Sequence, residues 1–199
     1  MCCASWWRRR DGRHMIFRPL LIALLILAIA GKSSAMTNEV SDETLLQLVL
    51  KRAFTNGGYI VVSPQSEGVS KECKAQVVKE LKVQNGEVGE LFDKLVKHNQ
   101  KPVRLALKSS PKDGYLIDDG KYEKYFQKGG GGWERFYKEH PQAHGMTQVS
   151  LPVIDAKTGL VLIYYGNQYQ GLAGAGWIIL FKYEQGKLVE LGRSMLWVS

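Results

Sequence analysis

Cysteine is scarce in this chain, which holds three among its 199 residues. Cys2 and Cys3 lie near the start, and Cys73 stands alone in the rest of the sequence. This count excludes a small scaffold held together by several disulfides. Cys73 shares helical spacing with Val77 and Leu81, so we expect it to behave as a small buried hydrophobe. A reactive thiol and an intermolecular disulfide are the alternatives.

The sequence also lacks an apolar run of the roughly 20 residues that a helix needs to span a bilayer. The longest such run, residues 19–30, is about a dozen residues long, follows an arginine-rich start and precedes the small residues Ser33 and Ala35. This order predicts a secretory signal peptide over residues 1–35, cleaved after Ala35. Met15 is an alternative start, which would make residues 1–14 an upstream extension. A retained membrane anchor is the competing interpretation.

A strong excess of one charge is missing once this leader is set aside. The formal net charge of the whole chain is +8. Residues 1–35 hold six of the 27 basic groups and one of the 19 acidic groups, so residues 36–199 carry a net charge of +3. That value gives no electrostatic signature for nucleic-acid binding. We therefore expect a periplasmic or extracellular protein with no nucleic-acid partner and no stable membrane span after cleavage.

Internal repeats are absent as well, which excludes solenoids and propellers. Helical periodicity predicts helices over 41–54, 71–84, 88–96, 122–126 and 133–140. Alternation and apolar runs predict strands over 59–62, 103–107, 115–117, 147–154, 160–165, 177–183 and 188–198. The strands at 103–107 and 115–117 are expected to pair as a hairpin, and residues 166–176 are expected to form a glycine-rich loop. Helices come first and an antiparallel four-strand meander comes last.

This order predicts the α+β class, with N-terminal helices packed on one face of the C-terminal antiparallel meander. Residues 36–199 are expected to form a single domain. The four glycines at 129–132 mark a possible lobe boundary within it.

Catalytic patterns are poorly represented. No Gly-x-Ser-x-Gly elbow is present, and Ser150 has only sequence proximity to His144. His140 and His144 have the spacing of a helical metal pair, but Pro141 lies between them and ends the helix. We therefore predict no catalytic residue, no metal ligand and no cofactor, and interpret these histidines as solvated loop residues.

The acidic residues of the aromatic-rich region are the other candidates for catalysis. Glu134 and Glu139 are five residues apart, about 140° around a helix, and would not face one substrate. Asp155 follows a predicted strand at a turn. Solvated or ion-paired carboxylates are the expected state of all three residues.

The segment at 166–176 is the most unusual in the chain. A strand follows it, so it lacks the helix N-terminus that a nucleotide-binding loop needs. It is interpreted either as a tight connection between central strands or as a binding edge, in which amides offer hydrogen bonds and a tyrosine offers a stacking face. The predicted binding residues are Asn167, Gln168, Tyr169, Gln170, Trp133 and Tyr137.

The C-terminal third carries three distinctive strings: WERFY at 133–137, YGNQ at 165–168 and GLAGAG at 171–176. Over residues 133–199, these strings resemble a group of bacterial secreted proteins of unknown function. The resemblance implies a secreted β-rich module and no particular activity. Members of that group carry two cysteines in the glycine-rich segment, where this chain has Tyr169 and Ala173, so a disulfide or metal role there does not carry over.

The favoured function is a secreted or periplasmic binding protein without catalytic activity, such as an inhibitor, an immunity protein or an accessory factor. Its expected partner is another envelope or secreted protein, with a glycan as a further possibility. The alternative is an envelope hydrolase acting on peptidoglycan or polysaccharide, with Glu134 or Asp155 as acid or base. A passive structural module is a third. Clustering of both acids with a histidine in one cleft would favour the enzyme, and their dispersal would favour binding.

Overall fold

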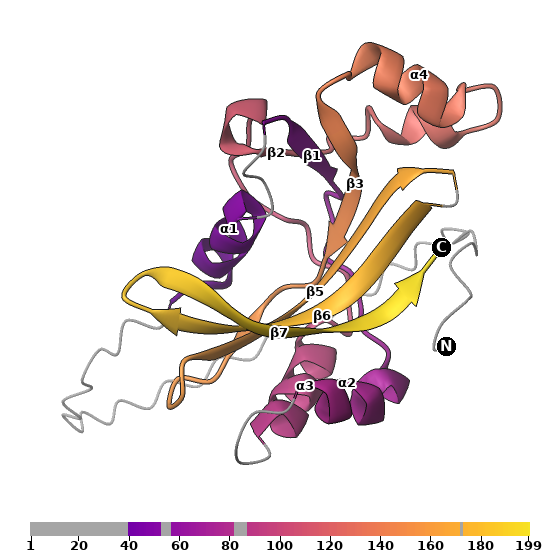
Figure 1. The fold of residues 1–199 in the computed structure, drawn as a ribbon. Coiled ribbons are helices and arrows are strands. Elements are labelled where there is room, and N and C mark those ends of the chain that lie inside the picture. The colour runs from indigo at the N-terminus through magenta and orange to yellow at the C-terminus, as the bar shows by residue number, and fades with distance from the viewer. Residues whose placement is uncertain (1–39, 53–56, 82–86, 172) are drawn as a thin grey trace, which may run out of the picture.

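A computed structural model describes residues 40–52, 57–81, 87–171 and 173–199 (Figure 1). The predicted signal peptide lies outside the described residues. The α-helices are α1 (Asp42–Arg52), α2 (Lys74–Glu80), α3 (Glu87–His98) and α4 (Gly132–Glu139), and short 3-10 turns are η1 (Lys71–Cys73), η2 (Pro111–Asp113) and η3 (Glu123–Phe126). The strands are β1 (Tyr59–Val62), β2 (Tyr115–Ile117), β3 (Ala143–Val149), β4 (Val153–Ile154), β5 (Leu160–Gln170), β6 (Ala173–Glu184) and β7 (Lys187–Val198). The predicted α+β class is confirmed.

All seven of these strands join one sheet in the order β2-β1-β3-β5-β6-β7, with β4 paired to β5. The pairs among β3 to β7 are antiparallel, as predicted for the C-terminal meander. The segment expected at 147–154 is divided into β3 and β4, and Pro152, which has no N–H to donate, lies between them. The sheet also takes in β1 and β2, which precede the meander in the chain; β1 pairs in parallel with both β2 and β3.

The predicted hairpin of residues 103–107 with 115–117 is wrong. Residues 103–107 form no strand; Arg104 makes an isolated antiparallel bridge with Gln65, flanked by hydrogen bonds from Leu105 N to the Pro64 carbonyl (2.9 Å) and from Ser66 N to the Val103 carbonyl (2.8 Å). β2 pairs in parallel with β1 instead. The alternation at 103–107 reflects one buried side chain, Leu105, beside exposed neighbours.

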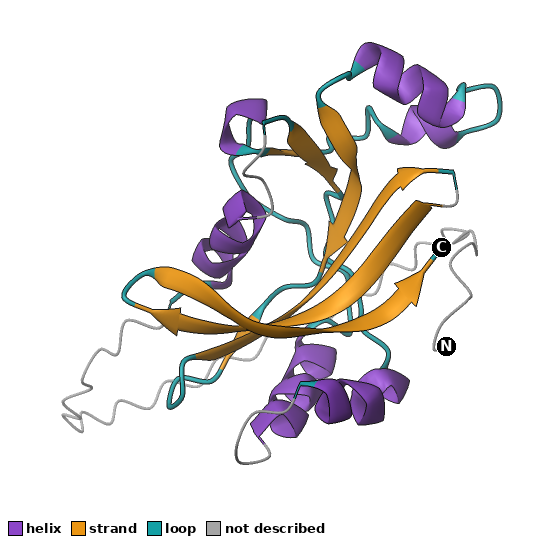
Figure 2. Cartoon of the chain, viewed as in Figure 1, coloured by secondary structure: helices purple, strands orange, loops and turns teal. Residues whose placement is uncertain are grey.

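Helices cover both faces of the sheet, which corrects the prediction of a single covered face (Figures 1 and 2). On one face, Leu46, Val49 and Leu50 of α1 pack against alternate residues of β5 and β6. On the other face, α2 and α3 pack against the intervening residues. Because the central strands are buried on both sides, their sequence is almost continuously apolar rather than alternating.

Cys73 belongs to this second core and is 1% exposed. The prediction that it packs as a buried apolar residue is therefore confirmed. Its neighbours there include Val77 and Leu81, the residues that shared its helical spacing.

A third core lies at the end of the sheet that α4 covers. Phe136 of α4 is fully buried, and its ring centroid lies 5.8 Å from that of Tyr122 and 5.7 Å from that of Tyr125 in η3. Trp133 and Tyr137 flank it on the same helix. This cluster packs α4 against β1 and β3.

β7 is an edge strand and carries the exposed apolar residues Val189, Leu191, Met195 and Val198. Such an edge is a template for pairing with another chain unless it is blocked. Here Arg52 donates to the Leu188 carbonyl (2.6 Å) and Gln76 donates to the Met195 carbonyl (2.6 Å). The two side chains occupy backbone acceptors that an added strand would use.

No helix in the described part of the chain has the length and apolarity to cross a membrane.

Candidate functional site

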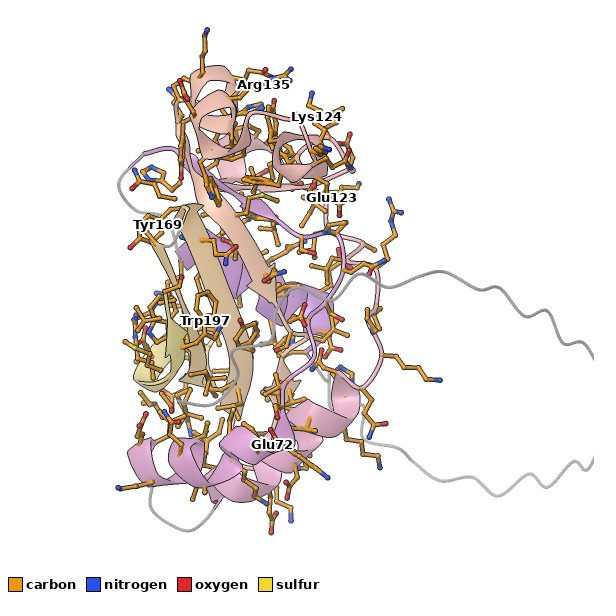
Figure 3. The ribbon with its side chains drawn as sticks, turned by 90° about the vertical axis from the view of Figure 1, so that its right-hand side faces the viewer. Glu72, Glu123, Lys124, Arg135, Tyr169 and Trp197 are labelled. Carbon is orange, nitrogen blue, oxygen red and sulfur yellow. The ribbon has the colours of Figure 1, made fainter. Side chains whose placement is uncertain are left out.

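The end of β5 and the region after α4 enclose a cleft of about 450 Å³, which we call the tip cleft. It is lined by Tyr137, Pro141, Ala143, His144, Asn167, Tyr169 and Gln170. Figure 3 shows Tyr169 at the end of the long strands below the helical region that carries Arg135. The tip cleft therefore joins two segments that are about 30 residues apart in the chain.

Four of the six predicted binding residues line the tip cleft: Tyr137, Asn167, Tyr169 and Gln170. The Tyr137 hydroxyl donates a hydrogen bond to the Tyr169 carbonyl and ties α4 to the end of β5. Tyr169 keeps 48% of its surface exposed, and Gln170 is also exposed. An aromatic ring and an amide are thus presented to solvent at one place.

The other two predicted residues have different positions. Trp133 lies behind the tip cleft, where its ring stacks on that of Tyr137 at a centroid distance of 5.8 Å and an angle of 23°. Gln168 precedes Tyr169 on the same strand and is exposed, but it does not line the tip cleft. The register between β5 and β6 is irregular from Gln168 to Gln170.

The predicted glycine-rich loop at 166–176 is wrong, because nearly all of it belongs to the β5–β6 hairpin. Two of its glycines, Gly166 and Gly176, lie where a side chain would collide with aromatic rings. A Cβ atom on Gly176 would lie 2.1 Å from the indole nitrogen of Trp197, and one on Gly166 would lie 2.5 Å from the Tyr164 hydroxyl. The Trp197 indole N–H in turn donates to that hydroxyl (3.0 Å). Glycine here indicates close approach within a strand, not a flexible connection.

The side-chain amide of Asn167 forms hydrogen bonds beneath the tip cleft. Its Oδ1 accepts a hydrogen bond from Thr147 Oγ1 (3.1 Å), and its Nδ2 donates to the His144 carbonyl (3.2 Å). Both partners lie on β3, so the amide ties β5 to β3 at the site. Pro141, Ala143 and His144 also line the tip cleft, and the sequence did not predict them as binding residues because no local pattern places β3 beside β5.

His140 is not the solvated loop residue that the sequence suggested. It ends α4 half-buried among aromatic rings, with Nδ1 3.2 Å from the Tyr59 hydroxyl and Nε2 3.1 Å from the Tyr125 hydroxyl. Tyr125 donates its proton to Glu139, so it must accept from His140 Nε2–H. His140 Nδ1 is then the acceptor for Tyr59. The neutral imidazole satisfies both contacts.

Burial lowers the pKa of His140 below its ordinary value of 6.5, partly offset by the nearby Glu139 carboxylate. The unfolded chain therefore binds more protons than the folded one as the pH falls through about 6.5, and folding stability decreases. We expect the melting temperature of H140Q to fall less than that of the parent between about pH 7.5 and about pH 5.5. Thermal unfolding followed by circular dichroism measures the melting temperature of both proteins across this pH range. An equal fall in the two proteins would show that His140 does not contribute to the pH dependence of stability.

The residues considered for catalysis form hydrogen bonds within the fold. The Ser150 hydroxyl is buried and accepts from Tyr164 N (2.9 Å). Asp155 Oδ1 accepts from Lys157 N (2.8 Å) in a turn, and this bond lowers the pKa of that carboxyl. Glu139 accepts from Tyr125 and from Arg135 Nε (2.7 Å). Among the described residues, no three His, Cys, Asp or Glu side chains meet in a group that could hold a metal ion.

Comparison of the chain with protein-family models, curated proteins and solved structures gives no significant match. The assignment of a function therefore depends on the geometry of the site.

Glu134 and Asp155 lie far apart. Glu134 is an exposed residue of α4, the helix whose Tyr137 lines the tip cleft at the Gln170 end of β5. Asp155 donates its backbone N–H to the Leu160 carbonyl at the other end of that strand (2.9 Å). Eleven strand residues span about 35 Å, so these two carboxylates do not share a substrate.

Proposed function

We propose that the chain is a non-catalytic binding protein of the periplasm or the extracellular space, and that it captures another envelope or secreted protein at the tip cleft. The observation that carries this proposal is the convergence of Tyr137, Asn167, Tyr169 and Gln170 at one exposed place. An exposed tyrosine beside amide groups provides large contact area with adaptable hydrogen bonding, and tyrosine is enriched at protein interfaces.

The dispersal of Glu134 and Asp155 supports binding over the hydrolase alternative. An envelope hydrolase of the expected kind needs two carboxylates within about 10 Å of each other. The neighbouring groups with acid–base chemistry, His140 and Glu139, already hold one another through the Tyr125 hydroxyl. The proposed localisation depends on the leader sequence, with cleavage after Ala35 and a mature chain that begins at Met36.

Y169A/Q170A is expected to weaken partner capture by about tenfold or more, as removal of a central interface tyrosine commonly does. The fold should persist, because both side chains are exposed and the Tyr137 hydroxyl bonds to a backbone carbonyl that alanine retains. The measurement is affinity capture from a native envelope extract with the processed secreted chain, read by mass spectrometry.

Q168A is the matched control, because Gln168 is also an exposed amide of the same strand but does not line the tip cleft. A stoichiometric protein that is retained by the parent and by Q168A, but lost with Y169A/Q170A, would support the proposal. Equal retention by all three would show that the tip cleft does not bind the partner. Retention of no protein would contradict a protein partner, and a glycan array would then be the next test.

A further inference from the structure

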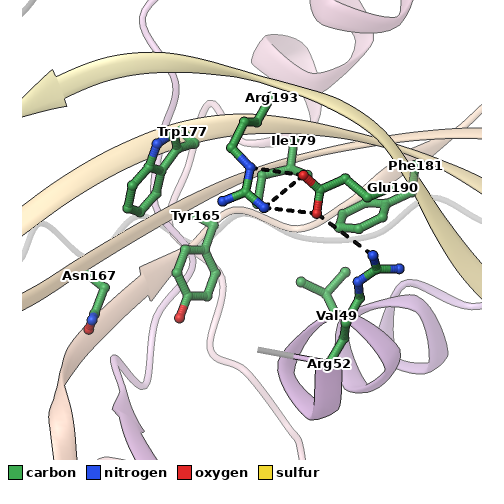
Figure 4. A pocket seen from close by; sticks show the side chains of 9 residues that line it. All are labelled: Val49, Arg52, Tyr165, Asn167, Trp177, Ile179, Phe181, Glu190 and Arg193. Atoms are coloured by element: carbon green, nitrogen blue, oxygen red, sulfur yellow. Dashed lines mark hydrogen bonds and ion pairs between the residues drawn. The ribbon is translucent and has the colours of Figure 1, made fainter. Parts of the chain in front are cut away.

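A second pocket lies beside the tip cleft, between α1 and the strands β5, β6 and β7 (Figure 4). We call it the arginine pocket. Its volume is about 400 Å³, and its lining residues are Val49, Arg52, Tyr165, Asn167, Trp177, Ile179, Phe181, Glu190 and Arg193. The two pockets share Asn167 and no other lining residue.

Two guanidinium groups flank one carboxylate in the arginine pocket (Figure 4). Arg193 Nε and Nη2 bind the carboxylate of Glu190 at 2.8 Å and 2.7 Å. Arg52 reaches the same carboxylate only at 3.9 Å, which is too long for a hydrogen bond, and it donates its other terminal nitrogen to the Leu188 carbonyl. The pocket therefore carries two fixed positive charges and one negative charge.

Both arginines retain hydrogen-bonding capacity. A guanidinium has five N–H donors, and the contacts described above engage only part of each set. The Arg52 and Arg193 side chains are 45% and 53% exposed, whereas Glu190 is 20% exposed. Donors are thus accessible on both sides of a largely covered carboxylate.

The remaining walls are apolar or aromatic. The rings of Tyr165 and Trp177 lie 6.3 Å apart at 34°, and Arg52 lies over the ring of Phe181 at 5.5 Å. Val49 and Ile179 complete the floor. Pockets of this size and composition are typical of small-molecule sites, in which a few polar groups orient an apolar ligand.

We propose that the arginine pocket binds a carboxylate attached to an aromatic group. The net charge of +1 from Arg52, Arg193 and Glu190 matches a monoanion. The planar carboxylate fits the forked donors of arginine, and an aromatic ring fits beside Tyr165 and Trp177. A dianionic phosphate would face stronger repulsion from Glu190. The same chemistry is offered by a free aromatic acid and by the C-terminal phenylalanine of a peptide.

Calorimetric titration of the secreted chain with N-acetylphenylalanine, 3-phenylpropionate and N-acetylphenylalaninamide tests the carboxylate. Both acids are expected to bind and the amide is expected to bind at least about tenfold more weakly, because it carries no negative charge to pair with the guanidinium groups. Tighter binding of a short peptide acid that ends in phenylalanine than of 3-phenylpropionate would identify a peptide C-terminus as the source. The reverse order would identify a free acid. Equal binding of acids and amide, or no binding at millimolar concentration, would overturn the proposal.

Three variants test the residues. R52Q and R193Q are expected to weaken binding of the acids by about tenfold each. E190Q is expected to tighten it, because the substitution removes the competing negative charge, and a folding defect would not produce this gain. R104Q is the matched control, since Arg104 is exposed and does not line the pocket. Weaker binding by E190Q, or an equal loss with R104Q, would contradict the proposal.

This proposal does not depend on the tip cleft. Y169A/Q170A should leave binding of the acids unchanged, because neither residue lines the arginine pocket. R52Q and R193Q should likewise leave partner capture at the tip cleft unchanged, because neither arginine lines that cleft. The two proposals can therefore fail separately.

Discussion

F136A is expected to lower the free energy of unfolding by about 3–5 kcal/mol, the usual cost of removing a buried phenylalanine ring. Phe136 has no exposed surface, and its ring lies within 6 Å of the rings of Tyr122, Tyr125 and His140. No other apolar side chain of α4 is fully buried, so a cavity at this position would remove much of the packing that holds the helix. Chemical denaturation followed by fluorescence measures the change.

F136L is the matched control for this prediction. Leucine keeps most of the buried apolar volume, so its cost should be smaller than that of alanine. F136A should also weaken partner capture at the tip cleft, because Tyr137 and the stacked Trp133 are positioned by the same helix. A cost below about 0.5 kcal/mol, the usual range of surface substitutions, would show that α4 is not held by this core.

G145A is expected to cost about 3 kcal/mol, because the site combines a backbone clash with a left-handed conformation. Gly145 has a φ angle of 95°, and a Cβ atom there would lie 2.1 Å from the Gln168 carbonyl oxygen. Tyr59 of β1 pairs with Ala143 of β3, and Val61 pairs with Met146, so β3 has one extra residue between these two pairs. Gly145 therefore lies in a β-bulge.

For a chain of this size, that cost corresponds to a fall in melting temperature of about 6–12 °C. G171A is the matched control, because nothing lies within 4 Å of a Cβ atom at Gly171 and its φ angle is not left-handed. Thermal unfolding of both variants is the measurement. Equal melting temperatures for G145A and G171A would show that the bulge is not required.

Much of the local structure follows from short-range pattern. The spacing of Val88, Leu91, Phe92 and Leu95 predicts the buried face of α3, and all four residues are buried. Ser41 caps α1 by accepting from Thr44 N (3.2 Å). The turn at 184–187 is also present, with positive φ angles at Gln185 and Gly186. Helix periodicity, caps and tight turns depend on neighbours in the chain, so the sequence alone is sufficient to predict them.

Pairing between distant segments was less accessible. The glycines at 166–176 had the composition of a loop, and only the folded positions of the Tyr164 and Trp197 rings explain Gly166 and Gly176 as strand residues. The parallel insertion of β1 between β2 and β3 has no signature in its four apolar residues. The arginine pocket depends on the same long-range contacts. Arg52 and Arg193 reach the same Glu190 carboxylate only after α1 packs beside β7.

The sequence by itself determined the α+β class, the buried cysteine and most of the residues at the tip cleft, because these depend on composition, periodicity and the side chains available. Only the tertiary structure decided that His140 is a half-buried partner of two tyrosines, that Gln168 does not line the tip cleft, and that Glu134 and Asp155 lie near opposite ends of β5. Each of these depends on which strands pair and in which register. A shift of one residue would reverse the faces of a strand, and no local pattern records that choice.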